Sequence, residues 1–377
     1  MRVVIAGGGT GGHLYPGLAL AEELRGRFGA EIMFVGTEKG LESRVVPKEG
    51  YPITILPAEG AAGKSVSRKF RAAVKLVRSV IKARKLLGSY EPDIVAGTGG
   101  YVSAAPVIAA KLLSIPVLIM EQNVVPGSAN RLLARISDAV AATYMESTNY
   151  FPKGKTFLTG NPVRAGILSA GRASSYELFR LEPEGLFTVL VFGGSAGATS
   201  INKAVTEALE HLADIKGKIQ FLHQSGQRDY QAVREAYRAL GFRAMVAPFI
   251  FQMAEAYAAA DMVISRAGAT TLAELTALGK PAVLVPYPYA GAHQEWNARK
   301  MEELGAARLV MDSDLSGRVI AQEIRSLMEN EAERVEMGVK SRAIGRPDAA
   351  RKAADLALSL VRMKRSIRGE HKHVQSI

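Results

Sequence analysis

Two stretches of the chain decide its fold: VVIAGGGTGGH at residues 3–13 and VLVFGGSAGA at residues 189–198. Each is a run of apolar, mostly β-branched residues that ends in a glycine turn and leads into a helical pattern. This strand–glycine–helix unit opens Rossmann-like domains, where the turn lets the backbone approach a ligand. Because the unit occurs twice, the sequence predicts two such domains.

Short apolar runs alternate with helical patterns around both stretches. The expected strands are 3–6, 31–35, 53–56, 94–96, 117–119 and 139–142, then 188–192, 219–222, 244–247, 262–264, 282–285 and 307–310. Continuous apolar strands that alternate with helices are typical of parallel sheets covered on both faces. The expected fold class is α/β, with two doubly wound parallel-sheet domains that face each other across a cleft.

The segment TGNPVR at 159–164 interrupts this pattern and separates the two series of strands. We expect an N-terminal domain over residues 1–163 and a C-terminal domain over 164–345. From residue 346 we expect a helix that returns to the first domain and carries a basic tail to residue 377. The length of 377 residues is too great for one ordinary core, which agrees with two domains.

The composition excludes several classes of protein. Apolar residues make up 48% and charged residues 22%, which argues against a disordered or fibrous chain. The absence of cysteine excludes a disulfide framework, a zinc ribbon and a thiol nucleophile. Neither a secretory signal nor a membrane span is expected, because glycine or proline interrupts every long uncharged window.

The formal net charge of +12 is concentrated in two places. Residues 64–90 hold nine Lys or Arg and no acidic residue, and the tail 362–377 holds five basic residues and one Glu. The rest of the chain is close to neutral. The charge pattern therefore indicates local contact with an anionic surface, either a membrane or a nucleic acid.

Within 64–90, two stripes share the helical spacing of three and four residues. The basic stripe is Arg71, Lys75, Arg78, Lys82 and Lys85, and the apolar stripe beside it is Phe70, Val74, Val77 and Ile81. A basic amphipathic helix is suited to docking on an anionic membrane. Two alternatives stay open: the apolar stripe packs on the sheet, or the basic stripe binds a nucleic acid, although few aromatic residues stand among the basic ones.

The first glycine loop, 7–12, ends at His13. Imidazole titrates near neutral pH, and the carboxyl end of a first strand faces the ligand in such sheets, so His13 is a candidate general base. The alternative is a polar residue at the start of a helix. A nicotinamide cofactor is disfavoured because no carboxylate ends the second strand, where Val35 leads into Gly36-Thr37 with Glu38 beyond.

Two further loops have the chemistry of an anion site. Ser195 lies in the second glycine loop, 193–197, and the segment SRAGATTLAE at 265–274 opens a helix whose first N–H groups can hold a phosphate. Glu274 either accepts hydrogen bonds from a ribose diol or completes a capping box with Thr271. Asp312-Ser313-Asp314 has the form of a metal-binding motif, but its place in a polar turn before a helix favours helix capping.

Seven motifs occur in one order: GGGTGGHLYPGLALA (7–21), GTGGYVSAAP (97–106), EQN (121–123), GNPVR (160–164), GGSAGA (193–198), SRAGATTLAE (265–274) and HQEWNA (293–298). In this combination they closely resemble the bacterial undecaprenyl-diphospho-muramoyl-pentapeptide N-acetylglucosaminyltransferase family. The resemblance runs from residue 3 to about residue 310. It implies the GT-B architecture of two Rossmann-like domains, which agrees with the division expected above.

The resemblance also implies which residues contact the substrates. UDP-N-acetylglucosamine is expected mainly on the second domain, with Glu274 at the ribose and the backbone of Ile250 at the uracil. The other implied contacts to the sugar nucleotide are Thr10, Gly11, Gly12, Asn123, Arg164, Ser195, Ala269, Thr270, Thr271, Leu272, Ala273 and Gln294. His13 and Tyr101 are expected near the acceptor. For Gln294, a polar helix face shared with Asn297 is the alternative.

The implied reaction is the inverting transfer of N-acetylglucosamine from UDP-N-acetylglucosamine to the C4 hydroxyl of undecaprenyl-diphospho-muramoyl-pentapeptide, for peptidoglycan synthesis. His13 is the expected base, and no cofactor and no metal are implied. The expected location is peripheral, on the cytoplasmic face of the cell membrane, with other cell-wall synthesis proteins as partners. The alternatives are another GT-B enzyme, such as a UDP-N-acetylglucosamine 2-epimerase or a glycolipid glycosyltransferase, and a nucleic-acid-binding protein that uses the basic stripe.

Overall fold

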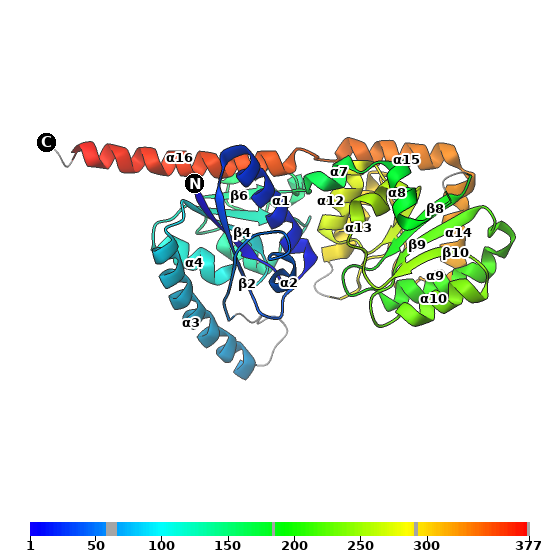
Figure 1. Ribbon diagram of the computed structural model, residues 1–377. Coiled ribbons are helices and arrows are strands. Elements are labelled where there is room, and N and C mark those ends of the chain that lie inside the picture. The colour runs from blue at the N-terminus through cyan, green and yellow to red at the C-terminus, as the bar shows by residue number, and fades with distance from the viewer. Residues whose placement is uncertain (58–65, 183–184, 290–292, 375–377) are drawn as a thin grey trace. The chain divides into compact units, whose positions relative to one another are not determined.

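The computed structural model describes residues 1–57, 66–182, 185–289 and 293–374, the side chains of 66–72 and 367–374 excepted. The chain forms two compact units (Figure 1). Unit 1 comprises Met1–Arg164 and Arg346–Ile377, and unit 2 comprises Ala165–Gly345.

Unit 1 contains a seven-stranded sheet in the order β3-β2-β1-β4-β5-β6-β7, with every neighbouring pair parallel. Its strands are β1 (Arg2–Gly7), β2 (Glu31–Gly36), β3 (Ile53–Ile55), β4 (Ile94–Gly99), β5 (Val117–Glu121), β6 (Ala139–Ala142) and β7 (Thr156–Leu158). Its helices are α1 (Gly11–Phe28), α2 (Glu42–Val45), α3 (Val66–Tyr90), α4 (Ala104–Leu112), α5 (Ser128–Leu133), α6 (Met145–Thr148) and α16 (Ala349–Val374).

The sheet of unit 1 has an apolar layer on each face because alternate strand residues point to opposite sides. Val3 and Ile5 of β1 belong to a core with Leu18 of α1 and Ala353 and Ala357 of α16. The opposite layer joins Val4 and Ala6 of β1 to buried side chains of α3, α4 and α5. The last helix of the chain is therefore part of the unit that the first strand begins.

Unit 2 repeats the plan with a six-stranded sheet in the order β10-β9-β8-β11-β12-β13, with every neighbouring pair parallel. Its strands are β8 (Phe187–Phe192), β9 (Ile219–Gln224), β10 (Arg243–Ala247), β11 (Met262–Ser265), β12 (Ala282–Leu284) and β13 (Arg308–Leu309). Its helices are α7 (Ala165–Ser169), α8 (Arg172–Phe179), α9 (Thr199–His211), the 3-10 helix Ala213–Ile215, α10 (Tyr230–Ala239), α11 (Met253–Ala259), α12 (Ala269–Leu278), α13 (His293–Glu303), α14 (Gly317–Glu329) and α15 (Glu331–Ile344).

The expected fold class, α/β with two doubly wound parallel sheets, is confirmed. The twelve predicted strands are present with shifts of a few residues at their ends, and β7 is an additional strand that the sequence reading missed. No helix in the described part of the chain is long and apolar enough to cross a bilayer.

The strand order places a topological switch point in each unit. In unit 1 the chain leaves β1 toward β2 on one side and reaches β4 on the other, and in unit 2 β8 has the same place between β9 and β11. Open α/β sheets bind ligands at the carboxyl ends of the strands at this point. Both glycine loops quoted above begin there, directly after β1 and β8.

Candidate active site

His13 lies in the first turn of α1, and its ring is held from one side. Its Nδ1 is 3.1 Å from the carbonyl oxygen of Thr98 and 3.3 Å from Oε1 of Gln122. A carbonyl oxygen only accepts hydrogen bonds, so in the neutral ring this contact places the proton on Nδ1 and leaves the lone pair on Nε2. The contact with Thr98 therefore favours the tautomer that a general base working through Nε2 requires.

Gln122 was missed as a site residue, although it stands in the quoted EQN motif. It is buried, and its Nε2 donates to the carbonyl oxygens of Thr98 at 2.9 Å and Met120 at 3.0 Å. These two bonds turn its Oε1 toward His13. A β-carbon at Gly99 would lie 2.6 Å from His13 Nδ1, so the close approach of the ring requires glycine there.

Asn123, an expected contact, is positioned by a buried carboxylate that was also missed. Glu121 is 2% exposed and accepts from the Asn123 backbone N–H at 2.9 Å, from its Nδ2 at 3.0 Å, and from Asn130 Nδ2 at 2.8 Å. A buried carboxylate holds its hydrogen-bond donors in place, because the loss of any of these bonds would leave its negative charge less well compensated in the protein interior. The loop after β5 is therefore held by hydrogen bonds to Glu121 at the carboxyl edge of the sheet.

The remaining predicted residues of unit 1 lie at the same edge of the sheet. Thr10 is the N-cap of α1, and Gly11 and Gly12 form the start of its first turn. Tyr101 follows β4 and is 42% exposed. Arg164, after β7, has its guanidinium 4.4 Å from the ring centroid of Tyr15 on α1. Unit 1 thus brings its predicted site residues together from β1, β4, β5 and β7.

In unit 2 the second glycine loop is tied to the segment that contains Ile250. Gln224, at the end of β9, donates from Nε2 to the carbonyl oxygen of Gly194 at 2.8 Å and accepts from the Ile250 N–H at 2.8 Å. Ser195 is exposed in the same loop. Because the Ile250 N–H already has this partner, a backbone contact from Ile250 to a base would use its carbonyl oxygen. Gln224 had no motif to identify it.

The segment 269–274 forms the first part of α12. The N-cap is Gly268, which has no side chain of its own to cap the helix, and the positive end of the helix dipole lies at the carboxyl edge of the sheet. The predicted residues Ala269, Thr270, Leu272 and Glu274 are buried, and Thr271 and Ala273 are half-buried.

The capping-box alternative for Glu274 is wrong. Thr271 is not the N-cap, because α12 begins at Ala269 and Thr271 stands inside its first turn. The Glu274 carboxylate instead accepts from the hydroxyl of Tyr257 on α11 at 2.9 Å. Both side chains are buried, with Tyr257 at 0% and Glu274 at 7% exposure. The carboxylate is therefore held in one orientation at the end of the sheet where α12 begins.

The capping role expected for Asp312–Asp314 is also wrong. Helix α14 begins at Gly317, and Ser316 caps it by accepting from the Val319 N–H at 3.3 Å. Asp312 instead pairs with Arg266 at 2.5 Å and accepts from Ser200 Oγ at 2.8 Å. Among the described residues, no group of three or more His, Asp or Glu side chains is placed to hold a metal ion.

Gln294 lies at the start of α13. Its Oε1 accepts from the backbone N–H of Tyr287 at 3.0 Å, which ties α13 to the loop after β12. Asn297, its alternative partner on a polar helix face, is buried and donates to the carbonyl oxygen of Ala267 at 3.4 Å. The two amides therefore have separate partners in the structure.

Behind the second glycine loop, a buried histidine holds the start of α9. His223 on β9 is 0% exposed, with Nε2 3.1 Å from Asn202 Oδ1 and Nδ1 3.1 Å from the Tyr237 hydroxyl. Asn202 Nδ2 donates to the Ser225 carbonyl and to Asp229, so its Oδ1 accepts the His223 proton. Burial lowers the pKa of His223 to about 3.

This depressed pKa predicts acid sensitivity of unit 2. In the unfolded chain the pKa of a histidine is about 6.5, so below that pH the unfolded state binds a proton that the folded state does not. At pH 5.5 the free energy of unfolding should be lower by about 1.4 kcal/mol than at neutral pH from this group alone. Urea unfolding followed by the fluorescence of Trp296, the single tryptophan, reports on unit 2.

The control for this prediction is His223→Gln, which removes the titrating group. The variant is expected to be less stable at neutral pH, but its loss of stability between pH 7.5 and 5.5 should be smaller by the same amount. An identical pH dependence in the variant and the native chain would contradict the prediction.

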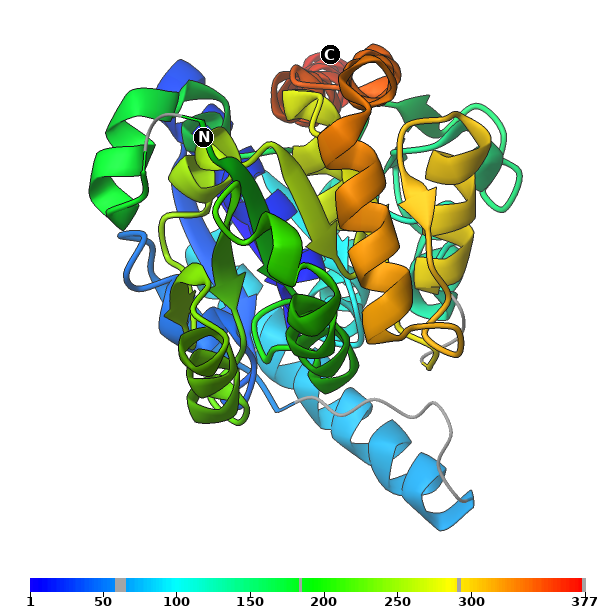
Figure 2. The ribbon, with the colours of Figure 1, turned by 90° about the vertical axis from the view of Figure 1, so that its right-hand side faces the viewer.

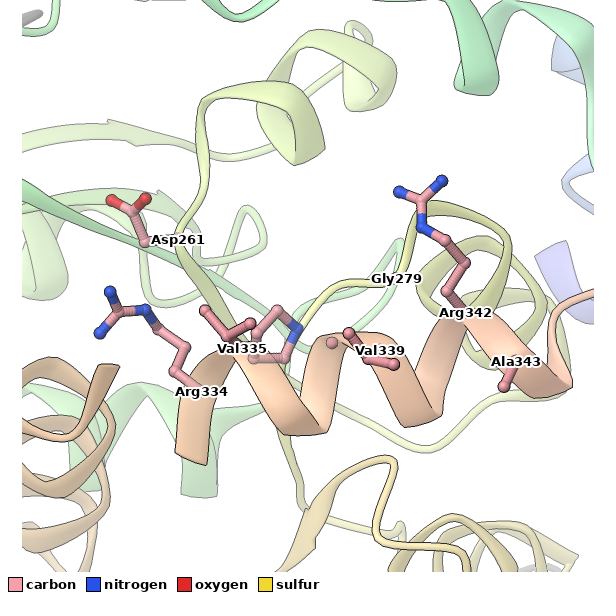
Figure 3. Close-up of a pocket in the computed structure, with 9 residues that line it drawn as sticks. Asp261, Gly279, Arg334, Val335, Val339, Arg342 and Ala343 are labelled. Atoms are coloured by element: carbon pink, nitrogen blue, oxygen red, sulfur yellow. The ribbon is translucent and has the colours of Figure 1, made fainter. Parts of the chain in front are cut away.

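A pocket of about 550 Å³ lies elsewhere in unit 2 (Figure 3). It is bordered by Asp261 and Pro281, which directly precede β11 and β12, and by Val335 and Val339 of α15. This is the amino-terminal edge of the sheet, opposite the glycine loops. Both arginines beside it have backbone partners, since Arg334 donates to the carbonyl oxygen of Leu327 and Arg342 to that of Leu278, each at 2.6 Å.

The two stripes of the basic segment lie on α3, whose amino-terminal part extends from the body of unit 1 in Figures 1 and 2. Ile81 is 65% and Val77 60% exposed, and Val74 is exposed as well. The basic residues Arg78, Lys82 and Lys85 are also exposed, and Lys75 is half-buried.

The inner face of α3 consists of other residues, Ser79, Ala83 and Leu87, each 1% exposed. The alternative that the apolar stripe packs on the sheet is therefore wrong for Val74, Val77 and Ile81. The side chains of Phe70 and Arg71 lie outside the described residues.

Residues 3–142 match the glycosyltransferase family 28 N-terminal domain, and residues 188–356 match the C-terminal domain of that family. The chain is 50% identical to a protein of Thermodesulfovibrio yellowstonii over 97% of its length and 100% of the relative. A protein of Myxococcus xanthus is 45% identical over 96% of this chain and 93% of the relative. Both are named UDP-N-acetylglucosamine–N-acetylmuramyl-(pentapeptide) pyrophosphoryl-undecaprenol N-acetylglucosamine transferase.

Solved structures agree with these relatives. The crystal structure of Acinetobacter baumannii MurG is similar with a TM-score of 0.73 and 31% identity, over 95% of this chain and 99% of the other. A UDP-GlcNAc 2-epimerase from Neisseria meningitidis, bound to UDP-GlcNAc, has a TM-score of 0.70 over 95% and 100% of the two chains. Its identity is only 15%, so this likeness concerns the fold alone.

Proposed function

The chain belongs to glycosyltransferase family 28, and from this membership we infer that it transfers N-acetylglucosamine from UDP-N-acetylglucosamine to N-acetylmuramyl-(pentapeptide) pyrophosphoryl-undecaprenol. The observation that carries this conclusion is identity of 43–50% with eight transferases of that name over at least 93% of the chain. The 2-epimerase alternative has only the shared fold in its favour.

The test is transfer of label from radiolabelled UDP-N-acetylglucosamine to a polyprenyl-linked muramoyl-pentapeptide. We expect a labelled lipid-linked disaccharide and release of UDP, both dependent on the acceptor. Release of UDP or formation of an epimerised sugar without the acceptor would instead favour the 2-epimerase, and no reaction in either case would contradict the assignment.

The reaction requires a base, and His13 is our proposal for it. The acceptor oxygen attacks the anomeric carbon of the sugar, the bond from that carbon to the UDP oxygen breaks, and the acceptor hydroxyl proton passes to the base. The bond from Nδ1 to Thr98 supports this role because it leaves the Nε2 lone pair to accept the proton. Gln122 orients the ring, and Tyr101 and Asn123 would contact the substrates beside it.

The departing UDP gains negative charge, which backbone dipoles and one arginine would stabilise. The amino-terminal turn of α12, with Thr270 and Thr271, and the loop containing Ser195 would face the diphosphate with backbone N–H groups and the positive end of a helix dipole. Arg164 adds a guanidinium, whose stacking on Tyr15 limits its conformations. Glu274 would accept from the ribose, and Gln294 would contact the sugar.

We further propose that α3 docks the enzyme peripherally on an anionic membrane, at the cytoplasmic face, where its lipid-linked acceptor would be presented. The exposure of Val77 and Ile81 beside Lys82 and Lys85 supports this proposal. The apolar side chains of such a helix can insert into the bilayer surface, while the basic side chains neutralise the lipid headgroups. Each basic residue near the surface contributes about 1 kcal/mol.

The docking proposal predicts the effect of Ile81→Glu. The change removes an exposed apolar contact and places a negative charge in the stripe, so binding to anionic phospholipid vesicles should fall roughly tenfold or more. Cosedimentation with vesicles measures it, and gel shift with DNA and RNA tests the nucleic-acid alternative on the same samples.

The matched control is Val339→Glu on α15, because Val339 is 64% exposed and Ile81 is 65% exposed. It should leave vesicle binding unchanged. Equal vesicle binding by the two variants, or retention by nucleic acid rather than by vesicles, would contradict docking through α3.

A further inference from the structure

Glu42 is a buried carboxylate that the reaction described above does not use. It is 0% exposed, at the start of the short helix α2. One oxygen accepts from the Gly9 N–H at 2.7 Å, and the other accepts from the Thr37 N–H and hydroxyl, both at 2.8 Å. All of these partners are donors, so both oxygens of the Glu42 side chain accept hydrogen bonds.

The space around Glu42 is made by three glycines from two segments of the chain. A β-carbon at Gly8, Gly36 or Gly40 would lie within 2.4 Å of the Glu42 side chain. Gly36 ends β2, Gly40 lies in the connection from β2 to α2, and Gly8 is in the first glycine loop. The carboxylate is thus enclosed by backbone, and a side chain at any of these positions would displace it.

Helix α2, which carries the Glu42 carboxylate, is anchored in the core of unit 1. Val46 is fully buried in the core of unit 1, and Leu41 and Val45 pack against the same core. The element next to Glu42 therefore cannot move without disturbing that core. Rigid support of this kind holds a functional group to within fractions of an ångström.

The Gly9 N–H is the amide that Glu42 reaches, and it lies directly before the segment that carries the base. Gly9 has φ +83°, and the next residue, Thr10, is the N-cap of α1. The N–H groups of His13 and Leu14 donate to the Thr10 carbonyl at 3.3 and 3.2 Å. A short covalent path therefore joins the Glu42 contact to the first turn of α1.

We propose that Glu42 is a positioning residue that holds the first glycine loop, and through it the first turn of α1 with His13, in the geometry the transfer requires. The carboxylate takes the loop amide that an anionic ligand would otherwise bind, so the loop is set before the substrates arrive. The kinetic part of this inference rests on the proposed transferase function. The structural part does not.

The test variant is Glu42→Gln, which keeps the size of the side chain. In this variant an NH2 group replaces one of the two carboxylate oxygens. That group cannot accept a hydrogen bond, so the bond from either Gly9 or Thr37 is lost. We expect kcat to fall about tenfold, because a displacement well below 1 Å at a reacting group is enough for such a loss. The dissociation constant for UDP-N-acetylglucosamine should change less than kcat, because most of the expected contacts to the nucleotide lie on the second domain. Glu38→Gln, at an exposed position of the same connection, is the matched control.

Hydrogen exchange provides a readout that does not depend on activity. Amide exchange over residues 7–14 should become faster in Glu42→Gln and remain native in Glu38→Gln, while exchange in unit 2 stays unchanged. If the native chain shows no transfer, the proposed function fails and exchange alone decides the role of Glu42. Native kcat together with native exchange in Glu42→Gln would overturn the proposal.

A second variant separates the carboxylate from the packing. Glu42→Ala leaves a cavity of the size of acetate, and added acetate should restore part of the lost kcat and slow the exchange of residues 7–14. Chloride at the same ionic strength should do neither. Failure of acetate to change either quantity would overturn the proposal, also in the case that Glu42→Gln does not fold.

Discussion

Replacement of His13 by alanine is expected to lower kcat by roughly 10²–10⁴-fold, the usual contribution of a positioned general base. The loss should appear in kcat because proton transfer takes place only during the chemical step. The dissociation constant of UDP-N-acetylglucosamine should change little, and a titration that follows the fluorescence of Trp296 can measure it. Transfer to the lipid acceptor, at saturating concentrations of both substrates, gives kcat.

The matched control is His211→Ala, because His211 is exposed at the end of α9 in unit 2. It should turn over like the native enzyme. Gln122→Ala should give a smaller loss than His13→Ala, since it removes one acceptor from His13 Nδ1 and leaves the Thr98 carbonyl. Turnover of His13→Ala within a few-fold of the native rate would exclude His13 as the base.

Glu274→Ala is expected to weaken binding of UDP-N-acetylglucosamine by roughly 30- to 150-fold. This corresponds to about 2–3 kcal/mol for hydrogen bonds from a ribose diol to a buried carboxylate. The effect should appear in the dissociation constant, because the ribose does not change during the reaction. The removal also leaves the Tyr257 hydroxyl without the carboxylate, so a lower melting temperature should accompany it.

A modified ligand separates the ribose contact from a structural effect. UDP-N-acetylglucosamine that lacks a ribose hydroxyl should bind the native chain more weakly, and this penalty should nearly vanish in Glu274→Ala. Glu302→Ala, at an exposed position of α13, is the control and should retain both the affinity and the penalty. If the loss of affinity were the same in Glu274→Ala and in the native chain, Glu274 would not contact the ribose and would have only the structural role of binding Tyr257.

The fold was predictable because its signals are local. The strands of both sheets are continuous apolar runs, and each glycine loop follows its first strand directly, so neither prediction needed to know which strands are neighbours. Strand β7 was missed because Thr156–Leu158 is short and only partly buried, which leaves no apolar run to recognise.

The site was predictable only where a motif marks it. His13, Ser195 and Glu274 stand in glycine-rich or helix-opening segments that have a known chemistry. Gln122, Gln224 and Glu42 act through partners that lie far from them in the sequence, at Thr98, Ile250 and Gly9. Glu42 belongs to the helix after the second strand, and no motif in the sequence links it to Gly9.

The sequence by itself determined the two Rossmann-like domains, the family and the concentration of positive charge on one helix, because periodicity, motif order and charge are properties of the chain. The tertiary structure decided which acceptor sets the His13 tautomer, that Glu274 bonds to Tyr257 instead of capping its helix, and that Ile81 is exposed while Ala83 is buried. The physical reason is that hydrogen bonds and burial depend on packing between distant segments. A helical stripe has the same spacing whether it faces a sheet or the solvent.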